Sequence, residues 1–146
     1  MKKVTEACIR EWVGATASQR GQGYVAQGKV LQPRRSGMLL KALCQGQAVE
    51  PYRVWVRLGE GEEPIVAARC TCPVGGEGRC KHVAAVLHLW RASPEAFAPE
   101  PPLAAQLMTW SQADLVALIC RMVERDPDLR ALVALHDAAP KPPRNQ

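Results

Sequence analysis

Aromatic residues and long apolar runs are scarce in this chain. Phe, Trp and Tyr make up 5% of its 146 residues, and there is a single Phe. No stretch approaches the roughly 20 consecutive apolar residues that a membrane-spanning helix needs. The start, Met1-Lys-Lys, is not followed by the apolar segment of a signal peptide. We therefore expect a cytoplasmic protein.

Residue patterns that support catalysis are also missing. The chain has three histidines, His82, His88 and His136. No serine or cysteine stands in a recognisable nucleophile motif, and no glycine-rich loop leads into Lys-Ser or Lys-Thr to hold a phosphate. These absences predict a protein that is not an enzyme.

The charge of the chain is unevenly distributed. Residues 1–92 contain 14 Lys or Arg and 7 Asp or Glu, a balance of +7, whereas residues 93–146 contain 5 and 7, a balance of −2. A basic front part suits a polyanionic partner. Mild basicity without such a partner is the alternative. The 47% hydrophobic content is enough for a packed core.

One short stretch concentrates soft metal ligands: Cys70-Thr-Cys72, seven residues, then Cys80-Lys-His82. Residues two apart on an extended chain point to the same side, so Cys70 and Cys72 can hold one ion together. The glycine-rich loop between the pairs supplies tight turns. Three thiolates and an imidazole suit one structural Zn²⁺ with all four positions filled. A disulfide would leave His82 unexplained, and a chance cluster of buried cysteines is the other alternative.

This stretch and the apolar run that follows it, Val83-Ala-Ala-Val-Leu-His-Leu-Trp90, resemble the SWIM zinc finger of the bacterial, Swi/Snf-associated type. The resemblance extends upstream through Arg20-Gly-Gln-Gly-Tyr24, so that it covers roughly residues 18–92. It implies a DNA-binding or protein-binding module without catalytic activity. It also implies an association with a Swi/Snf-like ATPase, because this chain has no motor of its own.

Hydrophobic periodicity predicts an α+β fold in which N-terminal helices pack on a small antiparallel sheet. The expected elements are helices over 5–13, 18–29 and 82–92 and strands over 30–36, 38–45, 52–58 and 65–70. Cys80 must lie just outside the third helix, because residues two apart do not share a helical face. His88 is interpreted as a surface or partly buried histidine. The cysteines outside the zinc pattern, Cys8, Cys44 and Cys120, are expected to be reduced and buried.

Prolines suggest the domain boundaries. We expect a zinc-binding domain over 1–92, with its zinc finger core at about 52–92, and a Pro-rich linker over 93–102. A helical hairpin should follow over 103–137, with helix starts at Ser111 and Asp126-Pro127. Two short amphipathic helices cannot bury their apolar faces alone, so they should dock on the front domain or on a partner. A disordered tail is expected over 138–146.

Two functions follow from these observations. The first is a nucleic-acid-binding zinc module, with DNA as the expected ligand, whose candidate contacts are Arg79, Lys81, Arg69, Arg53, Arg57, Trp55, Arg34 and Arg35. The alternative is a protein-interaction adaptor in which zinc only staples the fold. One strand face, Arg53-x-Trp55-x-Arg57, is interpreted either as open to solvent or an acidic partner, or as covered by an N-terminal helix with the arginines at its edges.

Overall fold

The computed structural model describes residues 2–140 and confirms the α+β class. The chain divides into two compact units, with the boundary between residues 102 and 103. The structure describes residues 2–102 of the first unit and residues 103–140 of the second. The first unit contains α1 (Glu6–Val13), α2 (Ala15–Ala26), β1 (Val30–Ser36), β2 (Leu39–Cys44), β3 (Tyr52–Leu58), β4 (Ile65–Cys70), α3 (Lys81–Ala92), a 3₁₀ turn (Pro94–Ala96) and β5 (Ala98–Pro99). Among the described helices, none is long and apolar enough to cross a bilayer.

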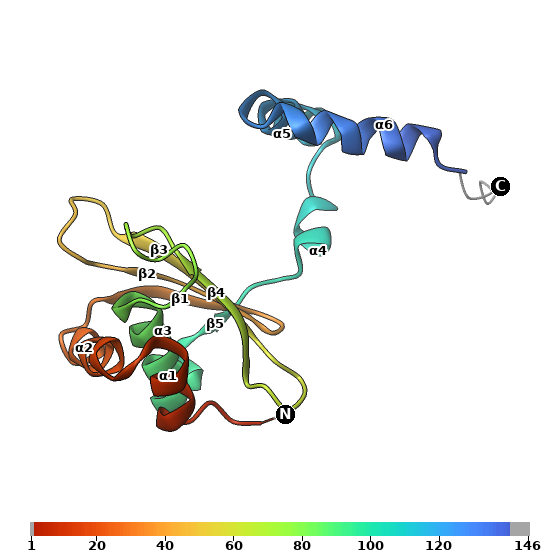
Figure 1. Ribbon diagram of the computed structural model, residues 1–146. Coiled ribbons are helices and arrows are strands. Elements are labelled where there is room, and N and C mark those ends of the chain that lie inside the picture. The colour runs from red at the N-terminus through yellow and green to blue at the C-terminus, as the bar shows by residue number, and fades with distance from the viewer. Residues whose placement is uncertain (1, 141–146) are drawn as a thin grey trace. The chain divides into compact units, whose positions relative to one another are not determined.

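The sheet has the order β4-β3-β2-β1-β5, and its first four strands form the predicted antiparallel meander. The three helices lie together on one face of this sheet (Figure 1). That face carries the alternate residues of β3, with Val54, Val56 and Leu58 buried. Strict alternation in β3 therefore creates one apolar face for the core and one face without a helix.

Helix α3 lies at the centre of the core. Val83, Val86 and Leu87 form one stripe of the helix and have no exposed surface, and Ala84 and Ala85, which lie outside this stripe, are equally buried. The helix packs both on the sheet and against α2. Gly21 of α2 permits the second contact, since a Cβ there would lie 2.6 Å from the Ala84 Cβ and 2.7 Å from the Ala85 nitrogen.

Two predictions about the helices were wrong in detail. Helix α2 begins at Ala15 rather than at Ser18, with Gly14 at its N-cap position. Ser18 is instead buried inside the helix, where its hydroxyl and carbonyl oxygens each lie 3.0 Å from the His88 Nε2. His88 is therefore a buried core residue, and its burial lowers its pKa.

The segment 93–102, expected to be a linker, is structured over much of its length. Phe97 is buried against the Trp90 ring, with 5.4 Å between the ring centroids. Residues 98–99 then form β5, which pairs in parallel with β1 at Arg34 and Arg35. Lys41 of β2 donates to the Glu100 carboxylate at 2.9 Å. The chain therefore stays on the sheet edge beyond the end of α3.

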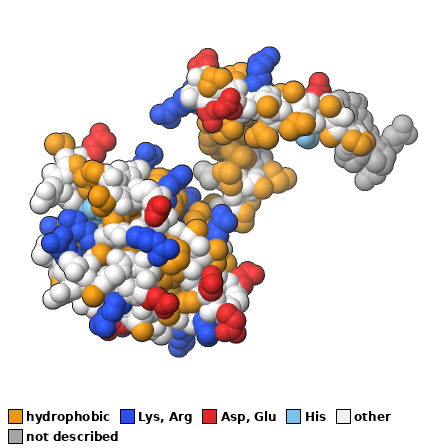
Figure 2. Space-filling view, viewed as in Figure 1, with side chains coloured by type: hydrophobic (Ala, Val, Ile, Leu, Met, Phe, Trp, Pro, Cys, Tyr) orange, Lys and Arg blue, Asp and Glu red, His pale blue; other side chains and the backbone are white. Residues whose placement is uncertain are grey.

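The described part of the second unit, residues 103–140, contains only helices. They are α4 (Leu103–Leu107), α5 (Gln112–Arg125), a 3₁₀ turn (Pro127–Leu129) and α6 (Arg130–Ala138). The predicted caps are present, because Ser111 accepts from the Asp114 amide and Asp126 accepts from the Asp128 amide. Apolar side chains remain on the surface of α5 and α6 (Figure 2). Residues 141–146 of the expected tail lie outside the described residues.

Candidate metal centre

Two secondary-structure boundaries, the end of β4 and the start of α3, bring the predicted zinc ligands together. Cys70 is the last residue of β4, and Cys72 follows in the turn. Cys80 is the N-cap residue of α3, and His82 lies in its first turn, as the spacing required. Because Cys70 pairs with Val54 across the sheet, it faces the same side as the buried core.

Two glycines of the connecting loop are required by close contacts. A Cβ on Gly75 would lie 2.6 Å from the Cys70 Cβ and 2.8 Å from the Cys72 Sγ. Gly78 has a φ of 68° and its missing Cβ would overlap the backbone of Ala68. The loop thus folds tightly under the first ligand pair and returns the chain to the second pair.

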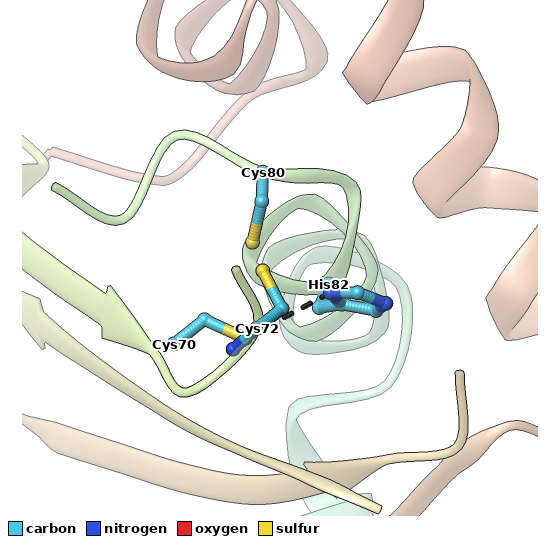
Figure 3. A group of neighbouring side chains, drawn as sticks. All are labelled: Cys70, Cys72, Cys80 and His82. Atoms are coloured by element: carbon cyan, nitrogen blue, oxygen red, sulfur yellow. Dashed lines mark hydrogen bonds between the residues drawn. The ribbon is translucent and has the colours of Figure 1, made fainter. Parts of the chain in front are cut away.

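The four side chains converge on one point (Figure 3). Their candidate ligand atoms all lie within 4.8 Å of one another, and all four residues are buried. The Cys70 Sγ and the His82 Nδ1 are 3.8 Å apart. A sulfur ligand at about 2.3 Å and a nitrogen ligand at about 2.0 Å from a tetrahedral Zn²⁺ would be about 3.5 Å apart, which is close to this distance. The Cys₃His cluster is therefore suited to one zinc ion.

The protonation of the thiols favours a cation. The Cys70 thiol donates a hydrogen bond to the Cys80 sulfur, and this bond lowers the pKa of Cys80 to about 4. The same bond, together with burial, raises the pKa of Cys70. The lowered pKa of Cys80 favours the thiolate form, which is the form that binds Zn²⁺, and the bound ion would displace the remaining thiol protons.

His82 presents Nδ1 to the cysteines and turns Nε2 away from them. Nε2 is buried and has no hydrogen-bond partner among the described residues. The imidazole packs against the rings of Tyr24 and Tyr52, whose centroids are 5.4 and 4.8 Å from its own. This packing fixes the ring so that Nδ1 is the nitrogen that would bind the metal.

The comparison with protein families agrees with this geometry. Residues 52–90 match the model of the SWIM zinc finger family. The SWIM segment, as we call residues 52–90, includes all four ligands and most of α3. The match does not extend to residues 18–51, where the sequence resemblance had been placed as well. No curated protein and no solved structure matches the chain.

The eight residues predicted to contact nucleic acid separate onto two faces of the first unit. Arg35 pairs with Leu40 and therefore lies on the helix side, where its guanidinium sits 5.1 Å from the Trp90 ring. Arg79 and Lys81 flank the zinc ligands on the same side. The remaining five lie on the other face, which has no helix: Arg34, Arg53, Trp55, Arg57 and Arg69.

Arg79 is used inside the fold. Its guanidinium lies 4.2 Å from the Trp12 ring centroid and donates to the Trp12 carbonyl at 2.7 Å. The Trp12 indole in turn donates to the Gly78 carbonyl at 2.9 Å. These contacts tie the zinc loop to α1. Lys81 similarly lies over the Tyr24 ring, at 5.6 Å.

The open face of the sheet, our name for the side opposite the helices, carries one continuous row. Arg34, Lys41, Trp55 and Arg69 are paired in register across four neighbouring strands. Trp55 is partly exposed, and the described helices of the first unit lie on the other side of the sheet. Lys41 was missed by the sequence reasoning, although Lys41 alternates with buried Leu40 and Ala42 and so had to face outward.

The remaining cysteines differ from one another. Cys44 is fully buried, and burial raises its pKa to about 12, so it is the reduced, buried residue that was expected. Cys8 is half-buried and accepts from the Thr5 hydroxyl, whereas Cys120 is exposed on α5. The expectation that all three are buried was wrong for these two.

Proposed function

We propose that the first unit is a non-catalytic nucleic-acid-binding module in which zinc supports the fold and the open face of the sheet is the interface. The observation that carries this proposal is the row Arg34, Lys41, Trp55 and Arg69, flanked on β3 by Arg53 and Arg57. Cations at this density suit a phosphate backbone, and the aromatic side chain suits bases.

The metal has a supporting role in this proposal. All four ligand positions come from the protein and are buried, whereas a hydrolytic zinc site keeps one position for water. Zinc would crosslink the end of β4 to the start of α3. It would thereby hold β3 and β4, which carry most of the basic side chains, in a fixed geometry.

The open face is better suited to a ligand than the zinc side. Arg79 and Lys81 are in contact with Trp12 and Tyr24, so binding a phosphate would cost some of these internal contacts. Arg34, Arg53, Arg57 and Arg69 are exposed, as Arg79 is, but the ring that Arg53 and Arg69 contact, Trp55, belongs to the open face itself. Among the described residues that line the hollows beside Trp55, Glu100 is the one carboxylate, and Lys41 already neutralises it.

Fluorescence anisotropy with labelled DNA and RNA at several salt concentrations tests the proposal. We expect binding that weakens steeply with salt, because phosphate contacts release counterions. Replacing Arg57 by Glu should weaken binding and reduce the log-log slope by about one per lost contact. The control is Arg91→Glu, which makes the same change in net charge on exposed α3 surface. Equal losses in both variants, or no binding at low salt, would contradict the proposed interface.

A second candidate function, a protein-interaction adaptor, is favoured by the second unit. Large apolar side chains stay exposed on both of its longer helices, with Ile119 at 49% and Leu132 at 61%. Such a surface on helices that cannot bury it themselves suits a protein partner, for which the SWIM resemblance suggests a separately encoded Swi/Snf-like ATPase. A pull-down of the purified ATPase should lose signal in Ile119→Asp and keep it in Val49→Asp, a 99% exposed position.

A further inference from the structure

We infer that the open face of the sheet binds single-stranded nucleic acid, with a base stacked on Trp55. This inference rests on the proposed function and specifies the ligand. It concerns the strandedness of the nucleic acid and the residue that distinguishes a single strand from a duplex.

Trp55 stands between two hollows of the open face. One has a volume of about 210 Å³ and is lined by Arg34, Lys41 and Arg53. The other has a volume of about 460 Å³ and is lined by Arg57, Ala67 and Arg69. Trp55 lines both. Each hollow is therefore lined by the indole together with arginine side chains, which are the groups on which a planar base can stack.

The shape of this face is unsuited to a duplex groove. Neighbouring strands lie about 4.8 Å apart, so a row across four strands is roughly 15 Å long. The major groove of B-DNA is about 12 Å wide and admits a helix or a two-stranded ribbon. A four-stranded face is too broad to enter it and would reach only the backbone. The bases of a single strand, in contrast, can turn toward a sheet and stack.

Two arginines already lie against the indole. The guanidinium carbons of Arg53 and Arg69 are 5.7 and 4.9 Å from the Trp55 ring centroid. Both side chains are exposed, so either can leave the ring at low cost. A base can then occupy the vacated ring face while the displaced guanidinium contacts the neighbouring phosphate. The arginine that is not displaced stays beside the indole, and the displaced guanidinium gains a contact with the phosphate charge.

The test compares a labelled oligodeoxythymidylate with a hairpin DNA duplex, using the full chain loaded with zinc. Trp55→Leu should weaken binding of the single strand about 5- to 150-fold, the range for loss of one stacked base. Trp55→Phe should retain most of the affinity. Neither change should alter duplex binding. Trp110→Leu, at a 38% exposed tryptophan of the second unit, is the matched control.

Two further measurements distinguish a loss of binding from misfolding of a variant. Zinc content is measured for each variant, and tryptophan fluorescence is followed during titration of the wild type and of Trp55→Phe. We expect quenching by the single strand in the wild type that is largely lost in Trp55→Phe.

The outcomes separate the two proposals. Equal affinity for duplex and single strand, or unchanged binding and quenching in the Trp55 variants, would overturn the inference and leave the proposed function standing. Absence of all nucleic-acid binding at low salt would overturn both.

Discussion

Cys44 and Cys72 are two buried thiols with different surroundings. Cys72 contributes one of the four converging ligand atoms. Cys44 is near enough for the charges of Cys80 and Cys72 to act on it, but burial is the main reason why its pKa is raised to about 12. What separates the two residues is position, because Cys44 lies outside the cluster of ligand atoms that are within 4.8 Å of one another. Only one of the two residues should therefore matter for the metal.

We predict that Cys72→Ala lowers the zinc content from one ion per chain and destabilises the first unit, because metal-binding free energy in a small site is largely folding free energy. The measurement is metal analysis of the purified variants together with urea unfolding. Cys44→Ala is the matched control and should keep its zinc, with a modest loss of stability from the vacated volume. Full zinc content in Cys72→Ala would refute the assignment of the ligands.

At the scale of residues, the sequence predicted the groups whose geometry is set by local spacing. It did not predict contacts between residues that are far apart along the chain. The ligands Cys70, Cys72, Cys80 and His82 could be predicted because their geometry is set within 13 consecutive residues. The role of Arg79 could not, since its partner Trp12 is 67 residues away and nothing in the local pattern indicates the contact. His88 was misjudged because a helix packed on two sides buries more than one stripe.

At the scale of elements, the crossing of α2 and α3 is the tightest contact between helices. Three glycines, Gly21, Gly23 and Gly28, lie in or just after α2. The structure distinguishes them: Gly21 contacts α3, Gly23 has open space where a Cβ would lie, and Gly28 has a φ of 66°.

We predict that Gly21→Ala destabilises the protein by about 1–3 kcal/mol, the usual cost of overpacking, because the added methyl would press on the backbone of α3. Gly23→Ala should instead be stabilising, by about 0.5–1 kcal/mol, since Ala is the better helix former. Urea unfolding of both variants measures the difference. If both substitutions have the same sign, helix propensity rather than packing dominates at this crossing.

Strands and helices with a clear hydrophobic period could be predicted from the sequence. The strand β5, which has no such period, was missed. The four strands of the meander and the caps at Ser111 and Asp126 follow directly from alternation and capping residues. β5 has two residues, one of them proline, within a segment whose composition indicates a linker. Its pairing depends on Phe97 finding a place in the core beside Trp90, which is a tertiary effect.

At the scale of the whole molecule, the segment 93–102 decides where the first unit ends. We predict that a fragment ending at Pro102 is more stable than one ending at Ala92. Burial of Phe97 alone contributes about 1.5–3 kcal/mol, and removal of β5 leaves the edge of β1 without a partner. Urea unfolding and size-exclusion chromatography compare the two fragments, and the shorter one should also self-associate through the open edge. Equal stability and two monomeric fragments would show that β5 is dispensable.

The path of the chain along the sheet edge also determines where the second unit is attached to the first. After β5, Glu100 is held by Lys41, which belongs to the same row as Trp55, and the second unit begins only three residues later, at Leu103. The attachment point of α4 to α6 is thus the border of the open face. A partner held by those helices would therefore share one chain with any strand bound on that face, so that binding of either ligand would raise the effective concentration of the other.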